Sequence, residues 1–342
     1  MKRLITIVIV LLLTVCIFSG LAAKILEDMN LPADGTDNST GSQTSNQITD
    51  SIPGNSGESE SESESESETE PSPPTPILEV PELNCSQVFI YDVDNDVFLY
   101  ERGTEQPIIP ASITKLLTAL CALHYMPADE LITPGDELAL LQKGSSTAYV
   151  KSNHTLTLEM LIEGMLLPSG NDAAFAVAAG VARYLNKDSQ LSGTEAIKIF
   201  MDLANDYAKT LGCTATHFTV PDGLAYEGHT STAHDLTLIG KAALKNELIT
   251  KYASTVSEKV IYASGHTMTW KNTNPLIDPT SSFYSPYVTG LKTGSLTDSY
   301  SVMVSADIGD RTFLMGFFGA PTKDGRYQDA LTVLDLILEQ TA

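Results

Sequence analysis

The chain has 342 residues, of which 42% are hydrophobic, and its formal net charge at pH 7 is −23. The hydrophobic content is enough for a buried core and argues against wholesale disorder. The acidic balance excludes a nucleic-acid binder that works by neutralising phosphates, because such a protein needs a basic face.

Residues 1–23 have the pattern of a targeting sequence. Lys2 and Arg3 precede the apolar run 4–18, and small residues follow it. A basic start, an apolar middle and a small-residue end are typical of a secretory signal peptide. Residues 4–23 are also long enough to cross a bilayer, so a retained membrane anchor stays open as the alternative. Either interpretation places the rest of the chain outside the cytoplasm.

Residues 24–80 predict a disordered acidic linker. This segment holds 13 acidic residues against one lysine, and acidic residues alternate with Ser or Thr from 58 to 70 before a proline-rich run. Such a segment has almost nothing to bury and repels itself, so it should stay solvated and extended. We expect a tether that lets the following domain work at a distance from a membrane.

Residues 81–342 predict one globular domain. Strand-like runs at 87–92 and 96–100 flank Asp94-Asn95, which is a hairpin signal. The remaining predicted elements are helices at 112–123, 156–166, 173–185, 197–211, 233–244 and 328–338, and strands at 256–262, 267–270, 287–292, 300–306 and 312–318. Strands near both ends with helices between them predict an α+β fold, in which terminal strands close one sheet around a helical insertion.

The first chemical motif is Ser112-Ile-Thr-Lys115, at the start of an apolar helical run. Residues three apart share one helix face, so the Lys amine can reach the Ser hydroxyl. A Ser hydroxyl becomes a good nucleophile when a neighbouring base takes its proton. Lys can be that base if burial lowers its pKa, and the apolar run supplies the burial. Taken alone, Ser112 could equally be a simple helix N-cap.

Two further motifs have polar residues in turn or strand-end positions. Ser169-Gly170-Asn171 lies between two predicted helices, and Lys292-Thr293-Gly294 ends a predicted strand. Each has a structural alternative when taken alone: a turn in the first case, and a strand edge followed by a Gly turn in the second.

In combination and in this order, the three motifs resemble the signature of active-site serine penicillin-binding proteins and related β-lactamases. The sequence in and around these motifs closely resembles that of the low-molecular-mass, serine-type D-alanyl-D-alanine carboxypeptidases of the peptidase S11 family. The segments that carry this resemblance are Pro110-Ala-Ser-Ile-Thr-Lys-Leu-Leu-Thr-Ala119, Gly144-Ser-Ser146, Leu166-Leu-Pro-Ser-Gly-Asn-Asp-Ala173, Pro221-Asp-Gly-Leu224, His229-Thr-Ser-Thr-Ala-His-Asp-Leu236 and Gly290-Leu-Lys-Thr-Gly294. The resemblance covers residues 81–342.

The resemblance implies the serine β-lactamase/transpeptidase-like fold, with an antiparallel sheet flanked by helices plus an all-α lobe, and the site between them. It implies that Ser112 attacks the carbonyl between the two terminal D-Ala residues of a peptidoglycan stem peptide, and that Lys115 takes its proton. Ser169 would relay a proton to the leaving amine. Asn171 would hold the peptide amide and orient Lys115.

The third motif is implied to bind the other end of the substrate. Lys292 would make the electrostatic potential of the site more positive, Thr293 would bind the terminal carboxylate, and Gly294 would let the substrate approach the strand. The backbone N–H groups of Ser112 and Ser295 would form the oxyanion hole. No metal or organic cofactor is expected, and β-lactams should acylate Ser112 because their strained amide mimics the D-Ala-D-Ala bond.

The chain departs from the family pattern at three places. Val220 stands where an Asn is common, and Asp298-Ser-Tyr300 replaces a small, Gly-rich approach to the next strand. Many relatives append an all-β domain and an amphipathic membrane helix, whereas this sequence ends soon after the predicted helix at 328–338. We therefore expect any membrane attachment to fall to residues 4–23.

Two other functions share the fold. A serine β-lactamase would need a deacylating base such as a Glu, and no Glu-x-x-x-Asn motif occurs between the second and third motifs. An inactive wall-binding module would keep the fold without acylation, although all three motifs are intact. Endopeptidase cleavage of cross-links stays open as a variant of the carboxypeptidase activity.

The remaining histidines and cysteines are assigned structural roles. His229 and His234 are five residues apart and poorly placed to share a helix face, so we expect both to be structural. Cys121 lies in the apolar helix and should be a buried free thiol. A Cys85–Cys213 bridge stays open.

Overall fold

The computed structural model describes residues 78–224, 226–263 and 265–341. The predictions for residues 1–23, and almost all of those for 24–80, concern segments outside these described residues. Leu78 is already buried, and its N–H donates to the carbonyl of Leu99. The described chain is therefore packed from its first residue. None of its helices has the length and apolar character needed to cross a membrane.

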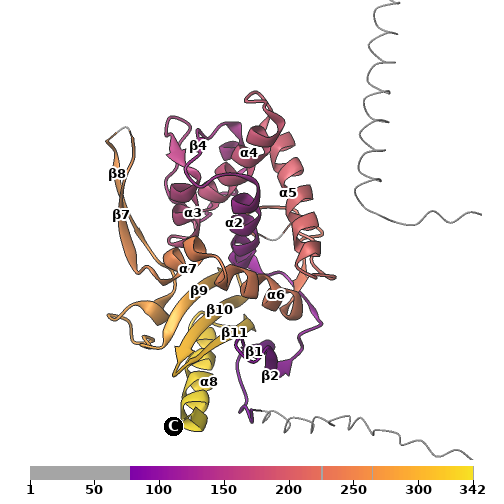
Figure 1. Cartoon of the computed structure of the whole chain (residues 1–342), viewed down its shortest axis with the longest axis vertical. Coiled ribbons are helices and arrows are strands. Elements are labelled where there is room, and N and C mark those ends of the chain that lie inside the picture. The colour runs from indigo at the N-terminus through magenta and orange to yellow at the C-terminus, as the bar shows by residue number, and fades with distance from the viewer. Residues whose placement is uncertain (1–77, 225, 264, 342) are drawn as a thin grey trace, which may run out of the picture. The chain divides into compact units, whose positions relative to one another are not determined.

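A five-stranded antiparallel sheet forms the lower part of the domain in Figure 1. Its strand order is β2-β1-β11-β10-β9, so the two N-terminal strands join the three C-terminal ones in one sheet through the pairing of β1 with β11, as the sequence predicted. The strands are β1 (Gln87–Asp92), β2 (Val97–Arg102), β9 (Val288–Ser295), β10 (Tyr300–Ile308) and β11 (Arg311–Ala320).

Both faces of the sheet are covered, which explains why its central strands are almost continuously hydrophobic. On β1 and β11, Phe89 and Leu314 face the core shared with the helical lobe, whereas Val88 and Met315 face the core under the last helix. That helix is α8 (Gly325–Thr341), and it packs on β10 and β11.

The helical lobe lies above the sheet in Figure 1. It contains η1 (Ala111–Ile113), α2 (Thr114–Tyr125), η2 (Asp136–Leu140), α3 (Leu158–Leu166), α4 (Asn171–Asn186) and α5 (Gly193–Thr210). Two helices, α6 (Ala233–Leu244) and α7 (Glu247–Ser254), lie where the lobe meets the sheet. The nearly all-apolar α2 contacts α3, α4, α5 and α6, as expected of a helix buried on every face.

Six short strands of the described chain form three separate antiparallel pairs outside the main sheet. The pairs are β3 (Pro107–Ile108) with β6 (Ser231–Thr232), β4 (Leu131–Ile132) with β5 (Leu156–Thr157), and β7 (Ser257–Ile261) with β8 (Thr267–Lys271). The short helix η3 (Pro275–Ile277) follows β8. The last pair confirms the strands predicted for both runs, and the structure places them in a separate hairpin outside the main sheet.

Other differences concern helix ends. Helix α7 was not predicted, although Asn246 caps it by accepting hydrogen bonds from Leu248 N and Ile249 N. The helix expected from residue 197 begins at Gly193, where Ser192 accepts from Glu195 N and donates to its carboxylate. Ser192 is therefore the N-cap residue of this helix.

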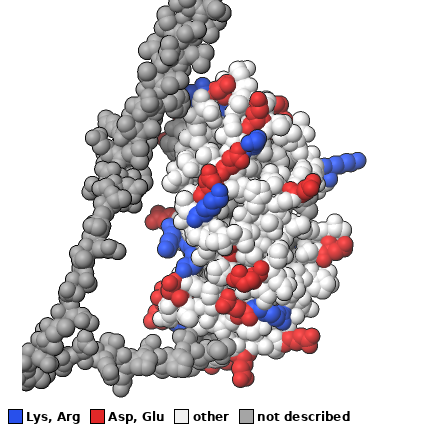
Figure 2. Space-filling view, turned by 90° about the vertical axis from the view of Figure 1, so that its right-hand side faces the viewer, with Lys and Arg blue, Asp and Glu red and all other residues white. Residues whose placement is uncertain are grey.

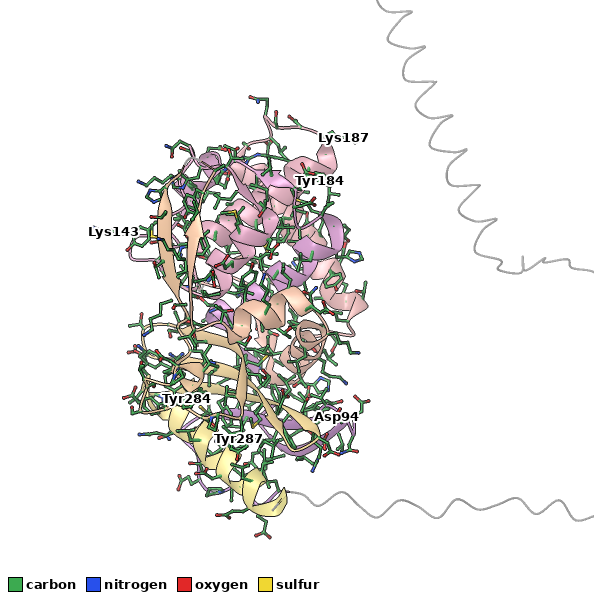
Figure 3. The ribbon with its side chains drawn as sticks, turned by 60° about the vertical axis from the view of Figure 1, so that its left-hand side comes forward. Asp94, Lys143, Tyr184, Lys187, Tyr284 and Tyr287 are labelled. Atoms are coloured by element: carbon green, nitrogen blue, oxygen red, sulfur yellow. The ribbon has the colours of Figure 1, made fainter. Side chains whose placement is uncertain are left out.

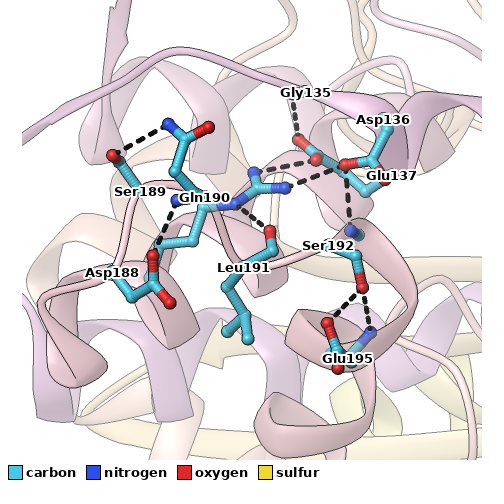
Figure 4. Close-up of polar contacts among 11 residues, drawn as sticks. Gly135, Asp136, Glu137, Asp188, Ser189, Gln190, Leu191, Ser192 and Glu195 are labelled. Atoms are coloured by element: carbon cyan, nitrogen blue, oxygen red, sulfur yellow. Dashed lines mark hydrogen bonds and ion pairs between the residues drawn. The ribbon is translucent and has the colours of Figure 1, made fainter.

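A polar clamp closes the far end of the lobe, as Figure 4 shows. The guanidinium of Arg183 on α4 bonds the buried carboxylate of Glu137 at 2.8 Å. Glu137 also accepts from Gly135 N, and the neighbouring Asp136 accepts from the N–H of Gly193 at the start of α5. The clamp joins η2, α4 and α5 into one unit.

The domain surface carries both signs of charge, and Figure 2 shows them interspersed on the side that includes α5. There Lys198 pairs with Asp202 one helical turn away. In Figure 3, Tyr184 and Lys187 mark the tip of the lobe, and Tyr284 and Tyr287 lie near α8 at the opposite end.

The three cysteines of the described chain are buried free thiols. The prediction for Cys121 is confirmed, and the open question of a Cys85–Cys213 bridge is answered in the negative. His229 is buried and stacks on Phe218 with ring centroids 4.7 Å apart. It joins Thr114 on α2 to the backbone N–H of Thr219, which agrees with its predicted structural role.

Candidate active site

A polar cavity of about 480 Å³ brings the three motifs together where the lobe meets the sheet. Ser112 comes from η1, Ser169 and Asn171 from the α3–α4 turn, and Thr293 and Ser295 from β9. Hydroxyls, amides and cationic groups dominate its lining. The described residues that line it are Ser112, Gly144, Ser145, Ser146, Ser169, Asn171, Leu224, Asn272, Thr273, Thr293, Ser295, Lys323 and Arg326.

The first motif places an amine directly on a hydroxyl. Ser112 lies in a 3-10 turn that runs straight into α2, so it is one turn before Lys115 rather than inside the α-helix. The Lys115 Nζ donates to Ser112 Oγ at 2.8 Å. It also donates to Asn171 Oδ1 at 2.8 Å and to the carbonyl of Asp222 at 2.9 Å. These three acceptors fix the fully buried amine against the hydroxyl.

Burial sets the protonation of Lys115. Removing the ammonium from water lowers its pKa from 10.5 to about 8, and the negative charges of Asp222 and Asp172 oppose that shift. A lysine with this pKa is about one-tenth unprotonated at pH 7, and the free amine is a base. The pair therefore has both the geometry and the protonation state needed to activate a hydroxyl.

The second and third motifs form a matching pair. Lys292 on β9 is fully buried, and its Nζ donates to Ser169 Oγ at 2.8 Å and to the carbonyl of Thr293 at 3.1 Å. Burial, followed by the positive charges of Lys115 and Arg326, lowers the pKa of Lys292 well below its usual value. Two serine hydroxyls in one cavity thus each accept a hydrogen bond from a lysine.

The turn that carries Ser169 is held by its neighbours. Ser169 has a left-handed backbone with φ 59°, an uncommon conformation for a non-Gly residue that marks many functional sites. Ser146 Oγ donates to the Ser169 carbonyl at 2.6 Å, and Asn171 N donates to the Ser146 carbonyl at 2.8 Å. The buried carboxylate of Asp172 accepts from Ala148 N and Val150 N, each at 2.8 Å. These contacts tie the 144–150 loop to the start of α4.

Two glycines let three chain segments meet around Ser112. A Cβ on Gly294 would lie 2.7 Å from the Pro110 carbonyl oxygen, and a Cβ on Gly223 would lie 1.9 Å from that of Ala111. The close approach that Gly294 permits in the structure is therefore that of the segment around Ser112. The resemblance had implied a different reason, namely the approach of substrate to the strand.

We expect Gly223→Ala to lower the free energy of unfolding by about 3 kcal/mol, because it adds a left-handed L-residue and a clash with backbone. Gly223 has φ +83°. The displaced Ser112 turn should also lose penicillin labelling. Gly228→Ala is the matched control, since its φ is +76° but its Cβ would meet only Thr219 Cγ2, at 3.8 Å. Urea unfolding of both variants measures the difference, and equal losses would contradict the packing argument.

Sequence reasoning missed a cation at the third motif. Arg326 on α8 is 1% exposed, and its Nη1 donates to the carbonyls of Gly294 and Ser301 and to Ser295 Oγ. No local pattern marks an arginine at the start of a surface-covering helix as a site residue, so only the packing of α8 on the sheet shows it. Lys323, just before α8, and Thr273, after β8, also line the cavity.

The two sequence departures with described positions lie outside the cavity lining. Val220 is buried and lies two residues before Asp222, whose carbonyl accepts from Lys115. Asp298-Ser-Tyr300 forms the turn into β10, closed by Leu296 N donating to the Ser299 carbonyl.

A polar cavity between an all-α lobe and an antiparallel sheet, with a buried lysine on the hydroxyl of a Ser-x-x-Lys motif, defines the class of active-site serine enzymes with the penicillin-binding/β-lactamase fold. The family model for D-alanyl-D-alanine carboxypeptidases, Peptidase_S11, matches residues 74–321. The chain belongs to this family.

Individual relatives agree with this assignment. The chain is 30% identical over 253 residues to the D-alanyl-D-alanine carboxypeptidase DacF of Bacillus subtilis, which covers 72% of this chain and 60% of that protein. It is 29% identical to DacC of Escherichia coli, covering 75% and 62%. The chain thus spans about three fifths of the length of these curated relatives.

Solved structures show the same fold. The Streptomyces K15 DD-transpeptidase superposes with a TM-score of 0.67 at 26% identity, covering 75% of this chain and 98% of that one. A D-alanyl-D-alanine carboxypeptidase from Mycobacterium tuberculosis gives 0.65 at 26% identity, covering 76% and 93%. The expected fold class, an antiparallel sheet flanked by helices with an all-α lobe, is confirmed.

Proposed function

We propose that the chain is a serine-type D-Ala-D-Ala carboxypeptidase, which removes the terminal D-Ala from peptidoglycan stem pentapeptides through an acyl-enzyme on Ser112. The observation that carries the proposal is the contact of 2.8 Å between the buried Lys115 amine and Ser112 Oγ. A hydroxyl nucleophile and its base are thereby already assembled in a cavity that can hold a peptide end.

In the first half of the reaction, Ser112 Oγ forms a bond to the carbonyl carbon of the penultimate D-Ala. Its proton passes to the unprotonated amine of Lys115, which the hydrogen bond already aims at the hydroxyl. The C–N bond then breaks, and the leaving D-Ala nitrogen takes this proton from Lys115 through Ser169, whose hydroxyl is held by Lys292. In the second half, water adds to the ester carbonyl and gives its proton to Lys115, which passes it to Ser112 Oγ as the ester C–O bond breaks.

The terminal carboxylate of the substrate and its peptide backbone are proposed to bind different residues of the cavity. Thr293, next to the buried basic side chain of Lys292 and in the same cavity lining as Arg326, is the receiver of the terminal carboxylate. Asn171 Oδ1 accepts from Lys115, so the side-chain NH₂ of Asn171 is the group left for a peptide carbonyl. The backbone N–H groups of Ser112 and Ser295 are the proposed oxyanion donors, and Gly294 keeps the β9 end close to them.

The setting follows from the reaction. A stem peptide is a cell-wall component, so the catalytic domain, proposed as residues 81–342, would act outside the cytoplasm. Residues 1–23 would direct export as a cleaved signal peptide or a retained anchor, and 24–80 would be the linker. β-Lactams would be covalent inhibitors at Ser112.

The test is D-Ala release from diacyl-Lys-D-Ala-D-Ala by the full chain, with the L-Ala-L-Ala peptide as control. We expect release from the first peptide only, together with one covalent penicillin per chain. Penicillin turnover that outpaces D-Ala release would favour a β-lactamase. Absence of both release and labelling from folded protein would favour an inactive wall-binding module. Both outcomes would overturn the proposal.

A further inference from the structure

The hydroxyl proposed to receive the substrate carboxylate has a partner of its own. Thr293 Oγ1 lies 2.7 Å from the Oγ1 of Thr273, a residue 20 positions earlier that follows the hairpin β7–β8. Both side chains line the cavity; Thr293 is 5% exposed, and Thr273 is an exposed residue. Neither the motifs nor their spacing pointed to Thr273.

The backbone on both sides of Thr273 is anchored by asparagines. Asn272 Nδ2 donates to the carbonyls of Ala253 and Thr255 at the end of α7, at 3.2 and 3.0 Å. On the other side, Asn274 Oδ1 accepts from Leu276 N at 3.1 Å, and this Asn is 1% exposed. We call Asn272-Thr273-Asn274 the threonine clasp. Two side chains thus fix the position of the single residue between them.

The clasp also reaches the second motif. Thr273 N donates at 3.0 Å to the carbonyl of Leu167, two residues before Ser169. One residue therefore contacts the segment of the second motif through its backbone and the third motif through its hydroxyl. A contact placed so firmly between two catalytic segments fits a positioning role better than a chance surface pair.

We propose that Thr273 is a positioning residue, whose hydroxyl donates to Thr293 so that the Thr293 proton points at the substrate's terminal carboxylate. A hydroxyl has one proton to donate and two lone pairs. When Thr293 accepts from Thr273, its own proton is free for the carboxylate, and the carboxylate's charge favours that direction in the chain of hydrogen bonds. This inference rests on the proposed carboxypeptidase function.

The test compares Thr273→Val, which keeps the shape and removes the hydroxyl, with Thr273→Ser, which keeps the hydroxyl. For D-Ala release we expect Thr273→Val to lower kcat/KM about three- to tenfold, mainly by raising KM. This is the size of effect expected from the loss of one neutral hydrogen bond. Thr273→Ser should stay within about twofold of wild type. The decrease in kcat/KM caused by Thr273→Val should be smaller for a substrate whose terminal carboxylate is replaced by a carboxamide.

Two further variants separate positioning from packing. In a Thr293→Val background, adding Thr273→Val should cause no further loss, because the partner hydroxyl is already gone. Thr289→Val is the matched control. Thr289 lies on β9, as Thr293 does, and its Oγ1 is 2.9 Å from Ser305 Oγ, but it does not line this cavity. It should leave kcat/KM unchanged.

The outcomes are distinguishable. Additive losses in the double variant, no loss in Thr273→Val, or an equal loss in Thr289→Val would overturn the role of Thr273 while leaving the carboxypeptidase proposal intact. A wild-type chain that neither releases D-Ala nor forms a penicillin adduct would overturn both.

Discussion

Ser112→Ala is expected to abolish both D-Ala release and covalent labelling by penicillin. The loss should be at least about 10³-fold, because residues that act as a nucleophile unit lose nearly all covalent catalysis when one member is removed. In the folded protein, the Lys115 amine would still have the Asn171 and Asp222 acceptors. The variant should therefore fold normally, and its thermal unfolding should stay close to that of wild type.

Mass spectrometry of penicillin-treated protein provides the direct measurement. Wild type should gain the mass of one penicillin on the peptide that contains Ser112, and Ser112→Ala should gain none. Ser254→Ala is the control, since this exposed hydroxyl on α7 donates only to a local carbonyl, that of Lys251. An adduct that persists in Ser112→Ala would show that another hydroxyl, such as Ser169, is the nucleophile.

Lys115→Arg should reduce the rate of acylation by about 10²- to 10⁴-fold, the usual contribution of a general base. Arg keeps the positive charge but is not deprotonated in proteins, so it cannot accept the Ser112 proton. Lys115→Met removes charge and base together. Equal losses in the two variants would identify proton transfer, rather than charge, as the task of Lys115.

The pH dependence gives an independent readout of the same group. Burial lowers the pKa of Lys115 to about 8, so below that pH the ammonium is the larger fraction and the share of free base falls with falling pH. The wild-type acylation rate should rise with pH through this value and level off above it. Stopped-flow measurements with a chromogenic β-lactam follow the curve. A rate that is flat across this range, or that falls with rising pH, would contradict the assignment.

Lys198→Met serves as the charge control for this series. Lys198 is an exposed residue of α5 whose ion pair is with Asp202 on the same helix. Its loss removes one positive charge from the surface without touching the cavity, so both the acylation rate and its pH profile should match wild type. A shift in the profile would mean that the protein's overall charge, rather than Lys115, sets the curve.

The elements that sequence located well are those specified by local pattern. The strand Gln87–Asp92 and the helix Ala233–Leu244 have the predicted bounds, because alternation, apolar periodicity and caps act within a few residues. The hairpin β7–β8 shows the limit of such reasoning. The residues of each run by themselves favour the strand conformation. Whether a strand joins the main sheet, however, depends on pairing partners that lie far away in the sequence.

Sequence by itself determined the pair Ser112 and Lys115, because three residues of helical chain are enough to bring the two side chains together. It also gave the three motifs in their order, and through them the family. The tertiary structure decided which distant groups complete the site. Lys292 meets Ser169 across 123 residues, and Arg326 and Thr273 reach the third motif from elements with no motif of their own. The physical reason is that such contacts depend on how α8, β9 and the segment after β8 pack together, and no local pattern encodes that packing.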